Sequence, residues 1–278
     1  MRFLSAFLLS VVLPALPAGA GETAWQEVAP GVSVRLISEG AVDAAGHTTV
    51  ALEIDMPENT KTYWRVPGET GLPTELDFSR SSGIAGHTQH WPLPQRDDQG
   101  GFLDYVYYGH TLLPVELSLT GPAGVVRLAA TFGVCSEICV PAHVELELPL
   151  SDTRRDIANG LRIDQALAEV PVTWEATPEP VGTVRHDPGA SAIVVELDST
   201  LVDPDSLIVA GDIHDPLFGT PQKSPQDDLV LLPILGKTDN SMLDGMVVEL
   251  SFMTPGGAFQ ISRTIEAGDQ ASVDGPGQ

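Results

Sequence analysis

The sequence predicts an all-β protein in which two β-sandwich domains are joined by a short helical connector. Most of the chain divides into short runs rich in β-branched and apolar residues, many of which alternate polar with apolar positions. Turns rich in glycine and proline separate these runs, and the 278 residues include 27 Gly and 23 Pro. One segment between the two groups of strands instead spaces its apolar residues as a helix does.

Residues 1–20 predict a secretory signal peptide. A basic start at Met1-Arg2 precedes the apolar run Phe3–Leu13, and the segment ends in Ala18-Gly19-Ala20. The apolar run is shorter than the roughly 20 residues that a membrane span needs. An ordinary buried N-terminal helix is the alternative. We expect cleavage after Ala20 and a mature protein that is exported and soluble.

The first predicted domain, residues 21–150, contains enough short strands for one immunoglobulin-like sandwich. The predicted strands are Val32–Ser38, Thr48–Asp55, Thr62–Val66, Thr74–Phe78, Thr88–Trp91, Leu103–Tyr107, Thr111–Leu119, Val125–Phe132 and His143–Leu150.

Residues 151–175 predict the helical linker. Ser and Asp residues that can cap a helix precede Ile157, Leu161 and Leu167, and Gly160 is expected to divide the segment into two short helices. Residues 176–267 predict a second, smaller sandwich, and the polar, Gly-rich tail 268–278 is expected to be flexible. The strands predicted in the second sandwich are Ala192–Leu197, Ser206–Ala210, Leu229–Ile234, Met246–Phe252 and Ala258–Ile265.

The charge of the chain limits its partners. Fourteen Lys and Arg against 38 Asp and Glu give a formal net charge of −24. Nucleic acid and anionic lipid surfaces would be repelled by such a protein, which argues against both as partners.

The only two cysteines, Cys135 and Cys139, lie between two predicted strands and are separated by three residues. In one extended strand their Cα atoms would be about 13 Å apart. A disulfide requires about 7 Å or less. If the chain turns at Ser136–Ile138, the cysteines face each other across a hairpin at about 4.5–5.5 Å. The pair is therefore expected at the tip of a hairpin.

Two cysteines in an exported protein are expected to pair. A bridge that closes so short a loop removes little chain entropy, so it adds little stability. Redox chemistry or metal capture explains the pair better, although a plain clip on the hairpin remains an alternative. Glu137 is the nearest charge in sequence and is expected to raise the pKa of both thiols. The pair would then exchange electrons when a partner's activated thiol attacks it.

Four segments in order resemble the periplasmic N-terminal domain of the DsbD/ScsB group of protein-disulfide reductases. The resemblance extends over roughly residues 25–150, and the order and spacing of the segments are similar to those of the family. The segments are Lys61–Pro73, His90–Arg96, Tyr108–Val115 and Gly133–Ala142.

This resemblance implies a periplasmic immunoglobulin-like domain that shuttles two electrons through Cys135 and Cys139, as a thiol:disulfide interchange protein. It also implies a cap loop over the pair, for which the stretch Asp97–Tyr105 is expected, with Phe102 as the shield and Tyr105 second. The given sequence contains neither the membrane domain nor the thioredoxin-like domain of the full transporters. We therefore expect a CcdA-like membrane donor or a soluble thioredoxin-like donor, and thioredoxin-fold proteins as exported partners.

No cofactor is expected for thiol–disulfide exchange. Two alternative functions stay open. Cys135, Cys139 and His143 offer two soft ligands and an imidazole suited to copper(I), and ScsB relatives are tied to copper tolerance. A hairpin would place His143 about 13 Å along the strand from Cys139, which disfavours shared ligation. His143 could also assist as a base or simply face solvent. A non-redox binding module is the second alternative.

Overall fold

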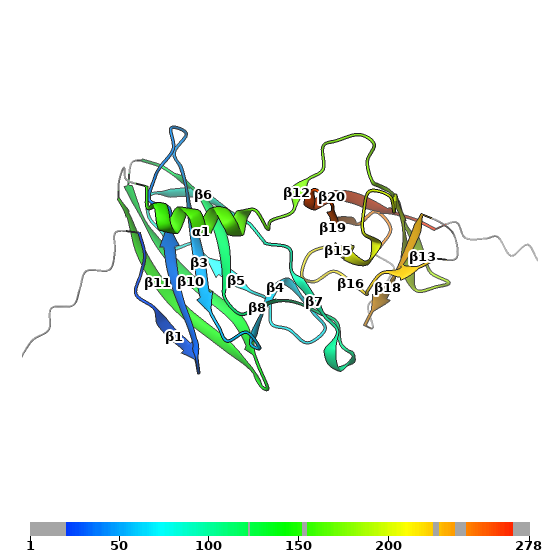
Figure 1. Ribbon diagram of the computed structural model, residues 1–278, viewed down its shortest axis with the longest axis horizontal. Helices are drawn as coiled ribbons and strands as arrows, with labels where there is room; N and C mark the ends of the chain where they lie inside the picture. Colours follow the sequence, from blue (N-terminus) through cyan, green and yellow to red (C-terminus); the bar gives the residue numbers. More distant parts are fainter. Residues whose placement is uncertain (1–20, 122, 152–154, 225–227, 237–242, 269–278) are drawn as a thin grey trace, which may run out of the picture.

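The computed structural model describes residues 21–121, 123–151, 155–224, 228–236 and 243–268. These residues form two β-rich units, the first sandwich (residues 21–151) and the second sandwich (residues 172–268), with one α-helix between them among the described residues (Figure 1). The all-β class with a helical connector is therefore confirmed. The predicted signal peptide, residues 1–20, lies outside the described residues, as does the tail from 269 onward.

The first sandwich consists of two mainly antiparallel sheets. One sheet has five strands in the order β1-β2-β3-β9-β6. Their bounds are Gln26–Ala29 (β1), Val32–Ser38 (β2), His47–Asp55 (β3), Thr111–Leu119 (β9) and Ile84–Gln89 (β6). The last strand begins four residues before the predicted one, because Ile84 to Gln89 pair with β9 while Trp91 packs beside the core after the strand has ended.

The second sheet of this sandwich has the order β11-β10-β4-β8-β7, and β5 pairs with β10 off this path. The bounds are Cys139–Ser151 (β11), Ala123–Cys135 (β10), Lys61–Gly68 (β4), Asp104–Tyr108 (β8), Gln95–Asp97 (β7) and Glu75–Asp77 (β5). The β10–β11 hairpin is the longest ladder, and its register runs from Ala123 opposite Ser151 to Cys135 opposite Cys139.

Alternating apolar side chains of the two sheets form the core of the first sandwich. On β10, Val126, Leu128, Ala130 and Phe132 are at most 1 % exposed, as the inward positions of a strand with period two should be. Trp64 lies in the same core and meets the ring of Tyr105 edge-on at 5.7 Å between centroids. Burial of these side chains is the main force that holds the sheets together.

The connector forms one helix, α1 (Ile157–Leu167), and lies across the first sandwich (Figure 1). Asp156 caps it by accepting a hydrogen bond from the Asn159 backbone N–H. Ile163 and Ala166 are buried against residues of β2, β3 and β9. The predicted break at Gly160 is wrong: Gly160 is buried inside the continuous helix, where the side chain of Arg155 occupies the adjacent space.

A buried carboxylate ties α1 to the sheet beneath it. Glu53 on β3 is 1 % exposed, and its Oε2 accepts a hydrogen bond of 2.6 Å from Arg35. Its Oε1 accepts one of 2.5 Å from Arg162 on α1 and lies 2.9 Å from His110 Nε2. Burial alone would raise the pKa of Glu53, but hydrogen bonds from Arg35 and His110 and the charges of Arg35 and Arg162 hold it below its usual value.

The second sandwich is built from one continuous set of pairings in the order β15-β19-β20-β13-β14-β18-β16. The strands are Ile208–Ala210 (β15), Val247–Thr254 (β19), Gly257–Glu266 (β20), Val181–Asp187 (β13), Ala192–Leu197 (β14), Leu229–Leu235 (β18) and Leu217–Phe218 (β16). Two short strands, Val172–Thr173 (β12) and Gln222–Lys223 (β17), pair with β20 and β18. Strand β13 was not predicted from the sequence, although its inward residues Val181 and Val184 are buried in a separate core.

Polar and apolar contacts join the two sandwiches. Ile208 and Ala210 of β15 belong to the same buried cluster as the core of the first sandwich. Arg65 on β4 donates a hydrogen bond of 2.7 Å to the Glu249 carboxylate and one of 3.1 Å to the Gly211 carbonyl. Figure 1 shows β4, β7 and β8 on the side of the first sandwich that adjoins the second.

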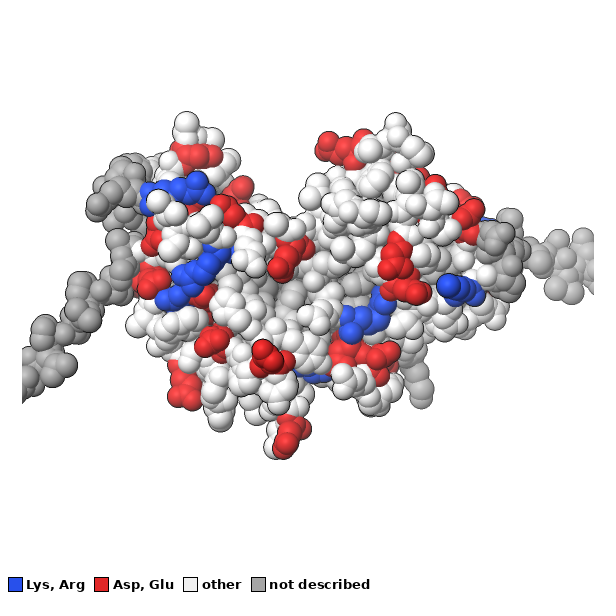
Figure 2. Space-filling view, in the orientation of Figure 1, with Lys and Arg blue, Asp and Glu red and all other residues white. Residues whose placement is uncertain are grey.

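Acidic side chains are spread over the visible face of both sandwiches, and basic ones are fewer (Figure 2). This distribution agrees with the formal net charge of −24. Among the described residues, no helix is long and apolar enough to cross a membrane.

Candidate functional site

A disulfide joins Cys135 and Cys139 at the tip of the β10–β11 hairpin. The chain turns through Ser136, Glu137 and Ile138, and the two cysteines are directly opposed with Cα atoms 4.1 Å apart. The predicted disulfide at a hairpin turn is therefore confirmed. Since the ladder beneath it is continuous, the position of both cysteines is fixed by backbone pairing as well as by the bond itself.

The two halves of the disulfide differ in their access to solvent. Cys135 is 2 % exposed, whereas Cys139 is exposed, as are the turn residues Glu137 and Ile138. Ile138 is 75 % exposed, so an apolar side chain stands beside the accessible sulfur. A macromolecule that approaches the tip of the hairpin therefore reaches Cys139 first.

Tyr63 on β4 covers the buried half. Its hydroxyl lies 2.9 Å from Cys135 Sγ and 3.6 Å from Cys139 Sγ. Tyr63, Val106 and Tyr108 form a small buried cluster with Cys135 on the face of the sheet that points away from the main core. Burial raises the pKa of Tyr63, so its hydroxyl keeps its proton and can donate to sulfur.

Two glycines allow the Tyr63 ring to lie against the backbone. A Cβ at Gly71 would be 2.2 Å from the ring, and one at Gly133 would be 2.9 Å from its other edge. Both distances are shorter than real Cβ contacts, so any side chain at these positions would displace the ring. The glycines in the segments Lys61–Pro73 and Gly133–Ala142 thus keep the Tyr63 hydroxyl on the disulfide.

A lysine held by two carboxylates adjoins this cluster. Lys61 pairs with Cys135 across β4 and β10, and its Nζ lies 2.6 Å from Asp97 Oδ2 and 3.5 Å from Asp104 Oδ2. The Tyr108 hydroxyl donates to Asp97 Oδ2 at 2.7 Å.

The charged forms of this group are favoured. Burial alone lowers the pKa of Lys61, but the hydrogen bond to Asp97 and the charges of Asp97 and Asp104 hold it above its usual value. Burial alone raises the pKa of Asp97, but hydrogen bonds from Lys61 and Tyr108 hold it below its usual value. The partly buried pair Lys61–Asp97 is therefore ionised at neutral pH.

Lys61 was not predicted as a cation beside the pair, because only charges close to the cysteines in sequence suggested themselves. Lys61 is 74 positions from Cys135 and reaches it through strand pairing. One feature of the sequence could have drawn attention to this residue: Lys61 is the only lysine before Lys223.

The segment Asp97–Tyr105, predicted as the cap loop, forms the turn of the β7–β8 hairpin. Within Asp97–Tyr105, the chain leaves β7, makes one turn at Gln99–Gly101 and enters β8. Phe102 lies at this turn and is 54 % exposed; its role as a shield stays a prediction. Tyr105 does not shield the disulfide, because it is fully buried in the main core on the opposite face of β8 from Val106 and Tyr108.

His143 lies on β11 opposite Thr131, and its Nδ1 is 3.1 Å from the Thr131 hydroxyl. It is exposed and four positions along the strand from Cys139. No group of three or more His, Cys, Asp or Glu side chains placed to hold a metal ion occurs in the described part of the chain.

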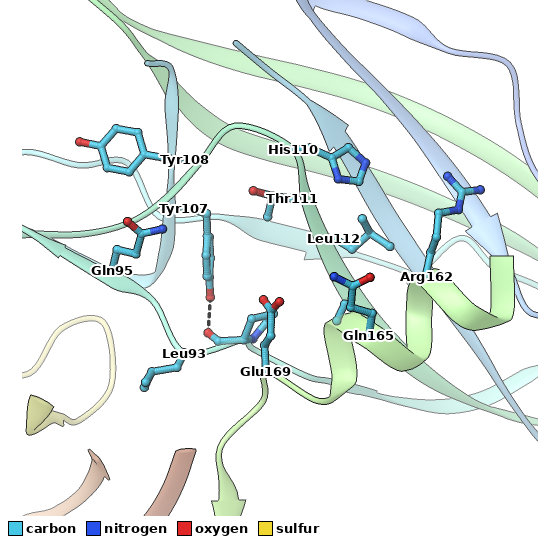
Figure 3. A pocket seen from close by; sticks show the side chains of 12 residues that line it. Leu93, Gln95, Tyr107, Tyr108, His110, Thr111, Leu112, Arg162, Gln165 and Glu169 are labelled. Carbon is cyan, nitrogen blue, oxygen red and sulfur yellow. Dashed lines mark hydrogen bonds between the residues drawn. The ribbon is translucent and has the colours of Figure 1, made fainter. Parts of the chain in front are cut away.

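A pocket of about 240 Å³ lies between α1 and the start of β9. Arg162 and Gln165 of the helix and Glu169 just beyond its end line it, and Tyr108 lies at the opposite end from Arg162 (Figure 3). The Tyr107 hydroxyl donates to the Pro92 carbonyl at 2.7 Å inside it (Figure 3). The pocket and the cluster around Cys135 share Tyr108.

Comparison with known proteins agrees with this architecture. Residues 33–151 match the family described as thiol:disulfide interchange protein DsbD, N-terminal. No curated protein matches the chain. Among solved structures, the crystal structure of the N-terminal periplasmic domain of ScsB from Proteus mirabilis matches with a TM-score of 0.71 at 22 % identity, and the match covers 90 % of this chain and 100 % of that one.

The likeness to ScsB shows that both sandwiches together have the fold of that domain. The family match covers the whole of the disulfide hairpin and the strands that carry Lys61, Tyr63 and Asp97. Residues 33–151 are therefore similar to the DsbD N-terminal family, and the chain shares the fold of the ScsB domain.

Proposed function

We propose that this protein carries out thiol–disulfide exchange in the periplasm, passing two electrons through Cys135 and Cys139. The observation that carries the proposal is the uneven disulfide: an exposed Cys139 at the tip of a hairpin is bonded to a buried Cys135 that touches the Tyr63 hydroxyl. A structural bridge closing three residues would add little stability. The family of residues 33–151 supports the same chemistry.

The exchange begins when the thiolate of a reduced partner attacks Cys139 Sγ. A new sulfur–sulfur bond forms between partner and Cys139, the Cys135–Cys139 bond breaks, and its electron pair leaves on Cys135 Sγ. The Tyr63 hydroxyl donates a hydrogen bond to this leaving sulfur. The partner's second thiol, as a thiolate, then attacks the partner sulfur that is bonded to Cys139. The bond between the partner and Cys139 breaks, and Cys139 leaves as a thiolate. Cys135 and Cys139 each take up a proton and are left reduced, and the partner leaves with its own disulfide.

The reduced pair gives the electrons to an oxidised partner by the reverse sequence. We propose a CcdA-like membrane protein as the electron donor and thioredoxin-fold proteins as the acceptors. Ile138 beside Cys139 offers an apolar contact to either partner. The periplasmic location is supported by the origin of the ScsB domain with the same fold.

Free-thiol titration of the purified protein tests the central claim. We expect two thiols after treatment with dithiothreitol, none after reoxidation, and loss of this reversible transition in Cys135→Ala. Two thiols that never pair under oxidising conditions would contradict the proposal. Titration of the reduced protein with copper(I), followed by metal analysis, distinguishes exchange from the copper-binding alternative.

Replacing Tyr63 by phenylalanine should slow reduction of the disulfide by dithiothreitol about tenfold. A hydrogen bond to a charged group contributes roughly 1.5–3 kcal/mol, and 1.4 kcal/mol corresponds to a factor of ten. Stopped-flow measurement of the rate of disulfide reduction over a pH range checks the expected slowing. Tyr107→Phe is the matched control, because it removes a buried hydroxyl that bonds to the Pro92 carbonyl in the same sandwich. An equal effect of both variants would exclude the role of Tyr63.

A further inference from the structure

The β7–β8 hairpin presents two different faces to the rest of the molecule. Arg96 is paired with Tyr105 and Asp97 with Asp104 across the two strands. Successive side chains of a strand point to opposite sides of the sheet. Arg96 and Tyr105 therefore share one face, and Asp97 and Asp104 share the other.

The first of these faces is bound to the second sandwich. Arg96 donates hydrogen bonds of 2.7 Å to the carbonyls of Asp205 and Leu207. The Tyr105 hydroxyl donates to the Phe218 carbonyl at 3.4 Å, and the Tyr105 side chain is fully buried. Three backbone carbonyls of the second sandwich thus hold adjacent residues of one hairpin.

The other face packs against the cluster that surrounds Cys135. Asp97 and Asp104 both contact the Lys61 amine, and Lys61 is the strand partner of Cys135. On the same face of β8, Val106 and Tyr108 pack with Tyr63 and Cys135. The hairpin therefore contributes part of the cover that keeps Cys135 from solvent.

Strand β7 has few other attachments. It has three residues, lies at the edge of its sheet and pairs there with β8. The turn that follows contains Gly100 and Gly101 at positive φ, where an added Cβ would meet no atom within 4 Å. The bonds from Arg96 to the second sandwich are accordingly a large share of what fixes this edge.

We propose that the second sandwich acts in the redox chemistry by holding the β7–β8 hairpin over Cys135, with Arg96 and Tyr105 as positioning residues. The proposal deepens the proposed function, because it assigns to the second sandwich control over access to the same disulfide. Loss of the Arg96 bonds frees β7, and the cover over Cys135 then opens more often.

The test uses the full chain with Cys139→Ala, in which Cys135 is the only thiol. Alkylation by iodoacetamide is followed over pH, and the plateau at high pH gives the access of the reagent to the thiolate. Arg96→Ala should raise this plateau rate about tenfold, the equivalent of 1.4 kcal/mol in the opening equilibrium. Arg96→Lys, which keeps one charged donor, should restore part of the protection.

Arg65→Ala is the matched control, since Arg65 also donates two hydrogen bonds to the second sandwich but lies outside the hairpin. It should change the plateau rate less than about twofold. Asp97→Asn should accelerate alkylation, and adding Arg96→Ala to it should have little further effect, because the two residues act through the same strand. If Arg96→Ala does not fold, Tyr105→Phe, which removes only the hydroxyl, takes its place with a smaller expected acceleration.

An unchanged plateau in Arg96→Ala, or equal acceleration by Arg65→Ala, would overturn the proposal. So would full additivity of Arg96→Ala and Asp97→Asn. Because alkylation needs no protein partner, this result stands apart from the proposed function, which fails if Cys135 and Cys139 do not cycle between thiols and disulfide.

Discussion

Once the disulfide is reduced, Cys139 should react with small electrophiles about a hundredfold faster than Cys135. Cys139 is exposed at the hairpin tip, whereas Cys135 is 2 % exposed and covered by Tyr63. Reaction at Cys135 requires a local opening, and an opening that costs about 3 kcal/mol slows it by about that factor. Second-order alkylation rates of Cys135→Ala and Cys139→Ala, compared at their high-pH plateaus, measure the difference.

Alkylation in concentrated urea is the control, because both thiols should then react at similar rates. The same asymmetry predicts that Cys135→Ala traps mixed disulfides through Cys139, while Cys139→Ala traps few. Folded-state rates within a factor of three of each other, or trapping mainly through Cys135, would contradict the assignment of Cys139 as the attacked sulfur.

Replacement of Glu53 by glutamine should destabilise the protein by roughly 3–5 kcal/mol, the usual effect of removing one partner from a buried ion pair. The change leaves Arg35, whose side chain is 13 % exposed, and Arg162 with only the more exposed carboxylate of Glu22 as a shared countercharge. It also loosens the attachment of α1 to the sheet. Urea unfolding followed by tryptophan fluorescence measures the loss.

Glu145→Gln is the matched control, because Glu145 pairs with Arg80 on the surface, where both side chains are more than half exposed. This change should leave the unfolding midpoint nearly unaltered. Equal midpoints for Glu53→Gln and the wild type would show that the buried cluster contributes no stability.

The stability that Glu53 contributes should decrease as the pH falls. The pKa of Glu53 is lower in the folded protein than its usual value of 4.5. Its ionised form therefore stabilises the fold fully above the pKa of the unfolded chain, and this contribution is lost as the pH falls through the folded value. The difference in unfolding free energy between wild type and Glu53→Gln should thus be largest near neutral pH and shrink in acid.

The disulfide hairpin was predictable because all of its information is local. Alternating strands on either side of Cys135 and Cys139 fix the ladder, and the geometry of a disulfide then requires a turn between them. The all-β class was predictable for the same reason. The prediction of a helix break at Gly160 was wrong because burial of Ile163 and Ala166 against the sheet outweighs the low helix propensity of one glycine.

The surroundings of the disulfide were not predictable in this way. Lys61, Asp97 and Asp104 come together through pairings between strands far apart in sequence. The prediction that Tyr105 shields the disulfide was wrong because a one-residue change of register exchanges the two faces of a strand. Its neighbours Val106 and Tyr108 are the residues that meet Cys135.

The length of the β10–β11 ladder has a consequence for how partners distinguish the two redox forms. Thirteen opposed residue pairs hold the hairpin from end to end, so its backbone is set without the sulfur–sulfur bond. Under the proposed function, we expect a visiting protein to meet nearly the same surface on the oxidised and the reduced form and to bind both with similar affinity. The direction of electron flow would then be governed by the reduction potentials and concentrations of the partners.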